Sequence, residues 1–266
     1  MVCISGNLDL ERGGVVDLII FMGQSNMAGR GDASKAPTVP DGWGYEFRAI
    51  SAPDRLYPMA EPFGAEENII TGINEPGMKT GSMVSAFTVE YYKGVKVPVV
   101  GISASKGASS IDEWQPGGSY LDDSIKRFKS AEGFLMRSGI EIRNRFMVWC
   151  QGERDGGKGM PGSEYKEKFN SMLEEMQRAG IERCFLVQIG FNSDFHDLYV
   201  EIMNAQIEIC DEDSRVVLVS AKFKEMLALG LMKDEFHYFQ EGYNIVGAQA
   251  GQNAALFVLG EAIPGE

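Results

Sequence analysis

The sequence has few histidines, few cysteines and a shortage of positive charge. Two histidines occur among 266 residues, a poor ligand set for a metal-dependent deacetylase. The four cysteines are widely spaced and form no CxxC pair, which argues against a zinc knuckle or a redox motif. We expect them to be small buried hydrophobic residues in a reducing compartment. They are Cys3, Cys150, Cys184 and Cys210.

Long apolar runs are also missing, so no segment is expected to span a membrane. The first fourteen residues lack a basic region followed by an apolar segment, which predicts an unsecreted, cytoplasmic protein. A sequence trimmed after a signal peptide would instead be secreted. The 25 Lys and Arg are outnumbered by 38 Asp and Glu, and the net charge of −13 argues against a nucleic-acid partner. An anionic substrate would need a local cation to offset this field.

The remaining composition is that of an ordinary globular protein, with 44% hydrophobic and 24% charged residues. Residues 1–266 are expected to form a single α/β domain. Strand-like and helical patterns alternate, which predicts a five-stranded, mostly parallel sheet. The expected strands cover 18–22, 96–103, 145–150, 184–189 and 216–220, and the expected helices cover 82–92, 121–137, 164–178, 198–209 and 242–259. Residues 32–81, rich in Gly and Pro, predict an extended connection that borders a functional site.

The most informative residue, Ser25, follows the first expected strand. The short, continuous apolar run 18–22 is typical of a strand buried on both faces, and Gly23 permits a tight exit from it. Functional groups of parallel sheets lie beyond the carboxyl ends of the strands. Ser25 is therefore a candidate nucleophile, followed by a helix whose free N–H groups favour developing negative charge. The alternative is that Ser25 only caps that helix.

A serine nucleophile needs a base, and the two histidines are the candidates. His237 follows the last expected strand, and Asp234 precedes it by three residues, a spacing at which a carboxylate orients an imidazole within one turn. His196 also has acidic neighbours and follows the strand at 184–189. Either histidine alone is equally compatible with a structural or solvent-facing role.

Four segments in one order carry a resemblance to a known family. They are GQSNMAGRG at 23–31, SASKGASSIDEW at 103–114, WCQGERD at 149–155 and DEFHYFQEGY at 234–243. With them the chain resembles the SGNH hydrolase superfamily, specifically its branch of sialate O-acetylesterases and carbohydrate acetylesterases that includes acetylxylan esterases. The resemblance implies a three-layer α/β/α, flavodoxin-like fold. It also implies a serine esterase that deacetylates carbohydrates without metal or organic cofactor.

The resemblance assigns roles to five residues. Ser25 becomes the nucleophile, His237 the general base and then acid, and Asp234 the residue that orients His237. The oxyanion hole is implied to consist of the backbone N–H groups of Ser25 and Gly107 and the side-chain amide of Gln151. From spacing alone, Gly107 is also compatible with a simple turn, and Gln151 with a polar end to a strand.

Three further residues are candidates for substrate binding. Glu153 is more readily interpreted as an acceptor that holds adjacent loops together than as a proton donor. Trp114 either stacks on a sugar face or closes the core. Arg154 stands where related sequences read QGES, and it either binds a substrate carboxylate, as in sialic acid, or forms a salt bridge with Asp155 or Glu153.

The expected substrates are therefore O-acetylated hemicellulose oligosaccharides or O-acetyl sialic acid, and the sequence does not decide between them. One alternative is a non-catalytic carbohydrate-binding protein with the same fold. A second is a short-chain lipase-like or thioesterase-like SGNH hydrolase, although the sequence contains no extended apolar lid. Neither a nucleic acid nor a membrane is expected as a partner, and the sequence predicts no oligomeric state.

Overall fold

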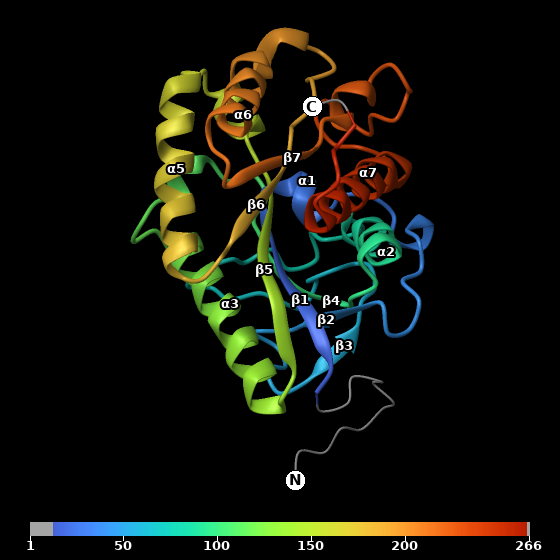
Figure 1. Ribbon diagram of the computed structural model, residues 1–266. Helices are drawn as coiled ribbons and strands as arrows, with labels where there is room; N and C mark the ends of the chain where they lie inside the picture. The colour runs from blue at the N-terminus through green and yellow to red at the C-terminus, as the bar shows by residue number, and fades with distance from the viewer. Residues whose placement is uncertain (1–12, 265–266) are drawn as a thin grey trace.

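The computed structural model describes residues 13–264, in which one seven-stranded sheet lies between two layers of helices (Figure 1). The strand order is β3-β2-β4-β1-β5-β6-β7. All neighbours run parallel except β2 and β3. The expected α/β fold with a mostly parallel sheet is confirmed, with seven strands instead of five. The strands are β1 Val15–Gly23, β2 Gly44–Phe47, β3 Leu56–Pro58, β4 Val99–Ser105, β5 Glu141–Cys150, β6 Arg183–Val187 and β7 Val216–Ser220.

The central strand β1 is buried from its second residue to its last. Its continuous apolar sequence suits this place because neighbouring strands and helices cover both of its faces. In the register of the sheet, Gly23 at the end of β1 lies opposite Ser105 of β4 and Cys150 of β5. The segments that follow these three strands therefore leave the sheet side by side.

The two additional strands lie inside the segment 32–81, which was expected to be an extended connection without regular structure. β2 adds four residues in parallel to β4, and β3 pairs antiparallel with β2 at the edge of the sheet. Strands of three or four residues are too short to show a periodic pattern. β2 is fixed by pairing with β4, and β3 by pairing with β2, neither of which the local sequence reveals.

The helices divide between the two faces of the sheet. α2 and α7 cover one face, and α3, α5 and α6 cover the other, where the apolar stripe of α5 includes Tyr165, Phe169 and Leu173 at helical spacing. The principal helices are α2 Val84–Val95, α3 Ser119–Ser138, α5 Gly162–Arg178, α6 Val200–Glu212 and α7 Gln240–Leu259. Single-turn pieces complete the chain: α1 Ser25–Ala28, α4 Glu153–Gly157, η1 Ala33–Lys35, η2 Ile111–Trp114, η3 His196–Tyr199 and η4 Lys222–Glu225.

Helices α2 and α7 approach each other closely because α7 places glycines where it meets α2. A β-carbon at Gly247 would lie 2.3 Å from the carbonyl oxygen of Met83, and one at Gly251 would lie 2.2 Å from that of Phe87. Backbone-to-backbone contact of this kind needs glycine. These contacts hold the middle of α7 against α2.

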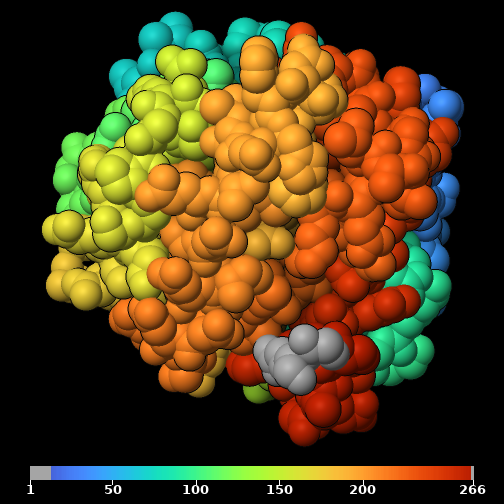
Figure 2. Space-filling view, turned by 90° about the horizontal axis from the view of Figure 1, so that it is seen from above, coloured from blue at the N-terminus to red at the C-terminus, as the bar shows by residue number. Residues whose placement is uncertain are grey.

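The segments around 190–240 form much of the face seen from above in Figure 2, where they are drawn in shades of orange. Within residues 13–264, no helix combines the length and the apolar character needed to cross a membrane. Cys150 and Cys184 are buried, as expected, whereas Cys210 is only half-buried. Cys3 lies outside the described residues.

Candidate active site

The turn that presents Ser25 is tight. Gly23 has a φ of 136°, and a β-carbon there would lie 2.0 Å from the carbonyl oxygen of Cys150. Gln24 takes the N-cap position of α1, so Ser25 is the first helical residue. Ser25 therefore does not cap this helix, and the alternative that it is only a cap is wrong. The expected helix is also reduced to the four residues of α1.

A second tight loop brings Asp234 and His237 together. The bridge between Met232 and Tyr238 and the hydrogen bond from the Lys233 N–H to the His237 carbonyl, 2.8 Å, close this loop between η4 and α7. Oδ1 of Asp234 accepts the backbone N–H of His237 at 2.7 Å, while its Oδ2 lies 2.8 Å from the Nδ1 atom of the imidazole. As the spacing of three residues predicts, the carboxylate of Asp234 contacts the imidazole of His237.

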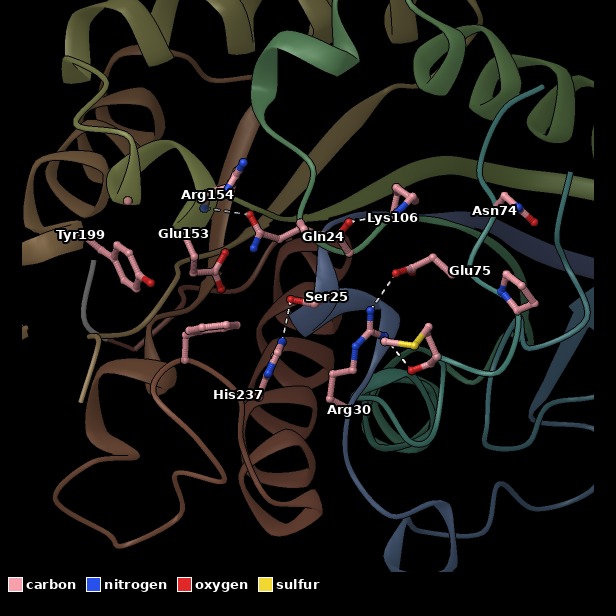
Figure 3. Close-up of a pocket in the computed structure, with 16 residues that line it drawn as sticks. Gln24, Ser25, Arg30, Asn74, Glu75, Lys106, Glu153, Arg154, Tyr199 and His237 are labelled. Atoms are coloured by element: carbon pink, nitrogen blue, oxygen red, sulfur yellow. Dashed lines mark hydrogen bonds and ion pairs between the residues drawn. The ribbon is translucent and has the colours of Figure 1, made fainter. Parts of the chain in front are cut away.

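The imidazole of His237 reaches the serine on its other side. Its Nε2 atom lies 2.9 Å from Oγ of Ser25 (Figure 3). With the contact between Asp234 and His237, the three side chains form a continuous row of hydrogen bonds. An ionised Asp234 fixes the proton on Nδ1 of His237, which leaves Nε2 to accept the Ser25 hydroxyl proton. This is the geometry that general-base activation of a serine requires.

The charges of this row favour a neutral imidazole beside an ionised carboxylate. Burial lowers the pKa of His237 below its ordinary value of 6.5, and the hydrogen bond from its ring to Asp234 only partly offsets the effect. Burial alone would raise the pKa of Asp234. The backbone N–H of Phe236 and the ring and backbone of His237 outweigh it by hydrogen bonding, so this pKa lies below 3.8.

His196, the other candidate base, lies away from this row. Its side chain is exposed, stacks on the ring of Phe191 with centroids 3.9 Å apart, and contacts Asp197 at 3.3 Å. It does not line the cavity that contains Ser25 and His237. The structure therefore brings only His237 to Ser25.

Ser25 and His237 lie on the wall of a cavity of about 560 Å³ at the carboxyl edge of the sheet. Gly107, which follows β4, lines the same cavity. Within residues 13–264, the backbone N–H groups of Ser25 and Gly107 donate no hydrogen bond. Two of the three expected oxyanion donors are thus unengaged. A β-carbon at Gly107 would lie 2.3 Å from Nη2 of Arg30 and 2.4 Å from Oε1 of Glu75, so this ion pair would have to shift.

The third expected donor, Gln151, requires a correction. Its side chain is fully buried and does not line the cavity. Its Nε2 atom donates to the carbonyl of Ser109, at 3.0 Å, and to the carboxylate of Asp155, while the Tyr165 hydroxyl lies 3.2 Å from its Oε1. Both amide hydrogens are engaged in the interior, so Gln151 has none to offer an oxyanion. Gln151 instead fits the alternative interpretation, in which it is a polar residue at the end of a strand.

Sequence reasoning missed the amide that does face the cavity, that of Gln24. Its Oε1 accepts the backbone N–H groups of Gly152 and Arg154, at 3.2 and 3.3 Å. Its Nε2 has no hydrogen-bond acceptor within the described residues, and the side chain lies between Ser25 and Arg154 in Figure 3. The signal was a glutamine directly before the serine in GQSNM.

The three candidates for substrate binding separate clearly. Trp114 is fully buried, donates from Nε1 to Oγ of Ser109 at 3.0 Å and packs against Trp149, so the prediction that it stacks on a sugar is wrong. Glu153 is 4% exposed and accepts from Nδ2 of Asn26 at 2.6 Å, as expected of a residue that joins loops. Arg154 is exposed on the cavity wall.

The alternative that Arg154 forms a salt bridge with Asp155 or Glu153 is not what the structure shows. The carboxylate of Asp155 is buried and binds the Ser110 hydroxyl and the Ile111 N–H, while the bonded oxygen of Glu153 faces Asn26. The guanidinium of Arg154 therefore remains available at the cavity. Lys106 and an ion pair between Arg30 and Glu75, 2.7 Å, complete the charged lining.

Within the described part of the chain, no cluster of three or more His, Cys, Asp or Glu side chains has the arrangement of a metal site. The groups placed around Ser25 instead supply a base, hydrogen-bond donors and a cavity open to a substrate. This set fits acyl transfer to a serine.

Comparison with known proteins agrees with this geometry. Residues 15–255 match the family described as carbohydrate esterase, sialic acid-specific acetylesterase. The chain belongs to this family. The resemblance to carbohydrate acetylesterases is thereby confirmed, and the protein is a carboxylic ester hydrolase. No relative among curated proteins matches the sequence.

Several solved structures share the fold of this carbohydrate esterase. A protein from Arabidopsis thaliana is 21% identical with a TM-score of 0.70, over 91% of this chain and 98% of that one. A carbohydrate acetylesterase from Xanthomonas citri is 14% identical with a TM-score of 0.60, over 92% of this chain and 57% of that one. A psychrotrophic esterase from Pseudoalteromonas is 11% identical with a TM-score of 0.50, over 91% and 99%. These likenesses support the α/β fold with a mostly parallel sheet.

Proposed function

We propose that this esterase removes O-acetyl groups from carbohydrates through an acetyl-serine intermediate. The observation that carries the proposal is the row of hydrogen bonds from Asp234 through His237 to Ser25, which ends at an open cavity. A serine hydroxyl becomes nucleophilic when a base removes its proton during attack, and this row provides that base.

In the first half of the reaction, Oγ of Ser25 attacks the acetyl carbonyl carbon while its proton passes to Nε2 of His237. The tetrahedral intermediate collapses as the imidazolium of His237 protonates the departing sugar oxygen. In the second half, His237 takes a proton from water, which attacks the acetyl-serine. Ser25 regains its proton from His237, and acetate leaves. Asp234 stabilises the charged imidazolium in both halves.

The negative charge of the intermediate needs donors on the other side of the carbonyl. We propose the backbone N–H groups of Ser25 and Gly107 and, in place of Gln151, Nε2 of Gln24. One such donor is typically worth about 10²- to 10³-fold in kcat. Gln24→Ala is expected to lower kcat by this factor. Gln151→Ala is the matched control, since an internal role predicts lower stability with little change in kcat. The opposite pattern would return the role to Gln151.

The nucleophile and the base are tested by single substitutions. Ser25→Ala should fold normally and lose turnover of a short nitrophenyl ester, because the hydroxyl that forms the acetyl-enzyme is gone. His237→Ala should be similarly damaging. His196→Ala is the control, because that exposed imidazole lies outside the cavity. Substantial activity in Ser25→Ala would reject the mechanism.

We propose that Arg154 decides between the two classes of sugar. Arg154 lines the cavity, and within residues 13–264 no carboxylate pairs with its guanidinium, which favours a sugar that carries a carboxylate, such as O-acetyl sialic acid. Acetate release should be compared on O-acetyl sialic acid and on acetylated xylo- and manno-oligosaccharides. Arg154→Ala is expected to raise KM for the acidic sugar alone. An equal rise in KM for neutral sugars would show that Arg154 does not recognise a substrate carboxylate. A preference of the unmodified protein for long acyl chains would favour a lipase-like hydrolase.

A further inference from the structure

Asn26, the residue after Ser25, has a fully buried side chain that joins three other parts of the chain. Its Nδ2 atom donates to Oε1 of Glu153 at 2.6 Å and to the backbone carbonyl of Phe236 at 2.9 Å. Its Oδ1 atom accepts the hydroxyl of Tyr243 at 2.7 Å. Both amide hydrogens are thus used, and both bind groups more than a hundred residues away in sequence.

These contacts lie directly beside the two reacting side chains. Asn26 adjoins Ser25 on α1, and Phe236 adjoins His237 in the loop before α7. The hydrogen bond from Asn26 to Phe236 therefore runs next to the one between Ser25 and His237 and connects the same two segments. The reacting pair is held by a second link that takes no part in proton transfer.

Glu153 holds this link from the far side. Its carboxyl group is buried, and its Oε1 atom accepts from Asn26. Its Oε2 atom is also buried and has no hydrogen-bond partner within the described residues. Glu153 also belongs to the cavity wall, and the side chain that its carboxyl group binds is that of Asn26.

We propose that Asn26 is a positioning residue that sets the approach of the Ser25 hydroxyl to the His237 imidazole, and that Glu153 acts on the reaction through Asn26. The inference rests on the proposed roles of Ser25 and His237. With Glu153 and Tyr243 holding its amide, Asn26 has one orientation in which Nδ2 reaches the carbonyl of Phe236. Loss of that orientation frees the His237 loop relative to α1.

The expected signature is a loss of kcat without a loss of substrate affinity. A displacement of about 1 Å between reacting groups lowers rates by about 10²-fold. We therefore expect Asn26→Ala to reduce kcat on a short acetyl ester by about this factor, with KM unchanged. Glu153→Asp, whose shorter side chain no longer reaches Asn26, should reduce kcat in the same way. Glu153→Gln keeps an oxygen acceptor for Nδ2 and should recover most of the activity.

A double-mutant cycle shows whether Glu153 works through Asn26. If it does, Glu153→Asp has no further effect on kcat in the Asn26→Ala background. Additive losses would overturn the proposal, as would a Glu153→Asp variant that raises KM and keeps kcat. Should Asn26→Ala fail to fold, the cycle of Tyr243→Phe with Glu153→Asp tests the same coupling. Glu167→Gln, at an exposed carboxylate on α5, is the control.

The rate at which a short phosphonate labels Ser25 separates this inference from the mechanism on which it rests. Labelling needs the activated hydroxyl but no turnover, so it should slow in Asn26→Ala in parallel with kcat. Normal labelling in that variant would overturn the positioning role and leave the proposed mechanism intact. Absence of labelling at Ser25 in the unmodified protein would instead reject the mechanism itself.

Discussion

The buried carboxyl of Glu153 makes a quantitative prediction about stability. Burial raises the pKa of this group from 4.5 to about 7, because the charged form loses more hydration than its hydrogen bond with Asn26 returns. Below pH 4.5 the carboxyl is protonated in both the folded and the unfolded chain. Between 4.5 and about 7, only the folded chain keeps the proton, so stability falls as the pH rises through this window.

The size of the effect follows from the width of that window. One pKa unit is worth about 1.4 kcal/mol, so ionisation of Glu153 destabilises the folded chain by about 3 kcal/mol once the pH exceeds 7. Glutamine has a similar shape and does not ionise. The free energy of unfolding of Glu153→Gln, relative to the unmodified protein, is therefore expected to increase by about 2–3 kcal/mol from pH 5 to pH 8.

Denaturant unfolding of both proteins at several pH values measures this difference. Any constant cost of the amide, such as an unpaired N–H group, appears equally at every pH and cancels in the comparison. Glu167→Gln, an exposed carboxylate, should show no such trend. A difference between Glu153→Gln and the unmodified protein that stays constant from pH 5 to pH 8 would refute the reasoning, since it would mean that the Glu153 carboxyl ionises as easily in the folded chain as in the unfolded one.

Three further predictions concern the cavity and its surroundings. Because the pKa of His237 lies below 6.5, pH–rate profiles should show that kcat/KM falls only when the pH drops below that value. Asp234→Asn lacks the charge that raises this pKa, so in this variant the fall should move to lower pH. Its kcat should also drop by about 10³- to 10⁴-fold. Gly107→Ala should lower kcat by about 10²-fold in steady-state assays, because the new methyl group meets the guanidinium of Arg30 and displaces the Gly107 N–H. Trp114→Phe should lower the free energy of unfolding by about 1–3 kcal/mol through loss of a buried hydrogen bond, with KM unchanged; a raised KM would restore the sugar-stacking role.

The parts of the fold that the sequence predicts well are those whose pattern is local and long. The helix expected at 164–178 appears at Gly162–Arg178, because its apolar stripe repeats over four turns. The strands β2 and β3 escaped prediction for the opposite reason. Each is three or four residues long, and each exists because a neighbouring strand offers hydrogen bonds.

In the candidate site, too, contacts between residues near in sequence could be predicted, and contacts between distant residues could not. Asp234 and His237 are three residues apart, so their contact follows from one tight loop and is visible in the sequence. The contact of His237 with Ser25 joins residues 212 positions apart and depends on how α7 packs against α2. Its prediction rested on family resemblance. Asn26 had no such signal, because an asparagine after a serine gives no local sign of three distant partners.

The proposed exchange of Gln24 for Gln151 illustrates why residue type and position do not determine a role. Both glutamines adjoin the carboxyl end of a central strand, and both have an amide to offer. Gln151 follows β5, where Asp155 and the Ser109 carbonyl capture its two amide hydrogens in the interior. Gln24 follows β1, and the N–H groups of Gly152 and Arg154 bind its oxygen instead. This orientation leaves the nitrogen of Gln24 directed to the cavity. The partners of the amide oxygen thus decide which glutamine can stabilise an anion.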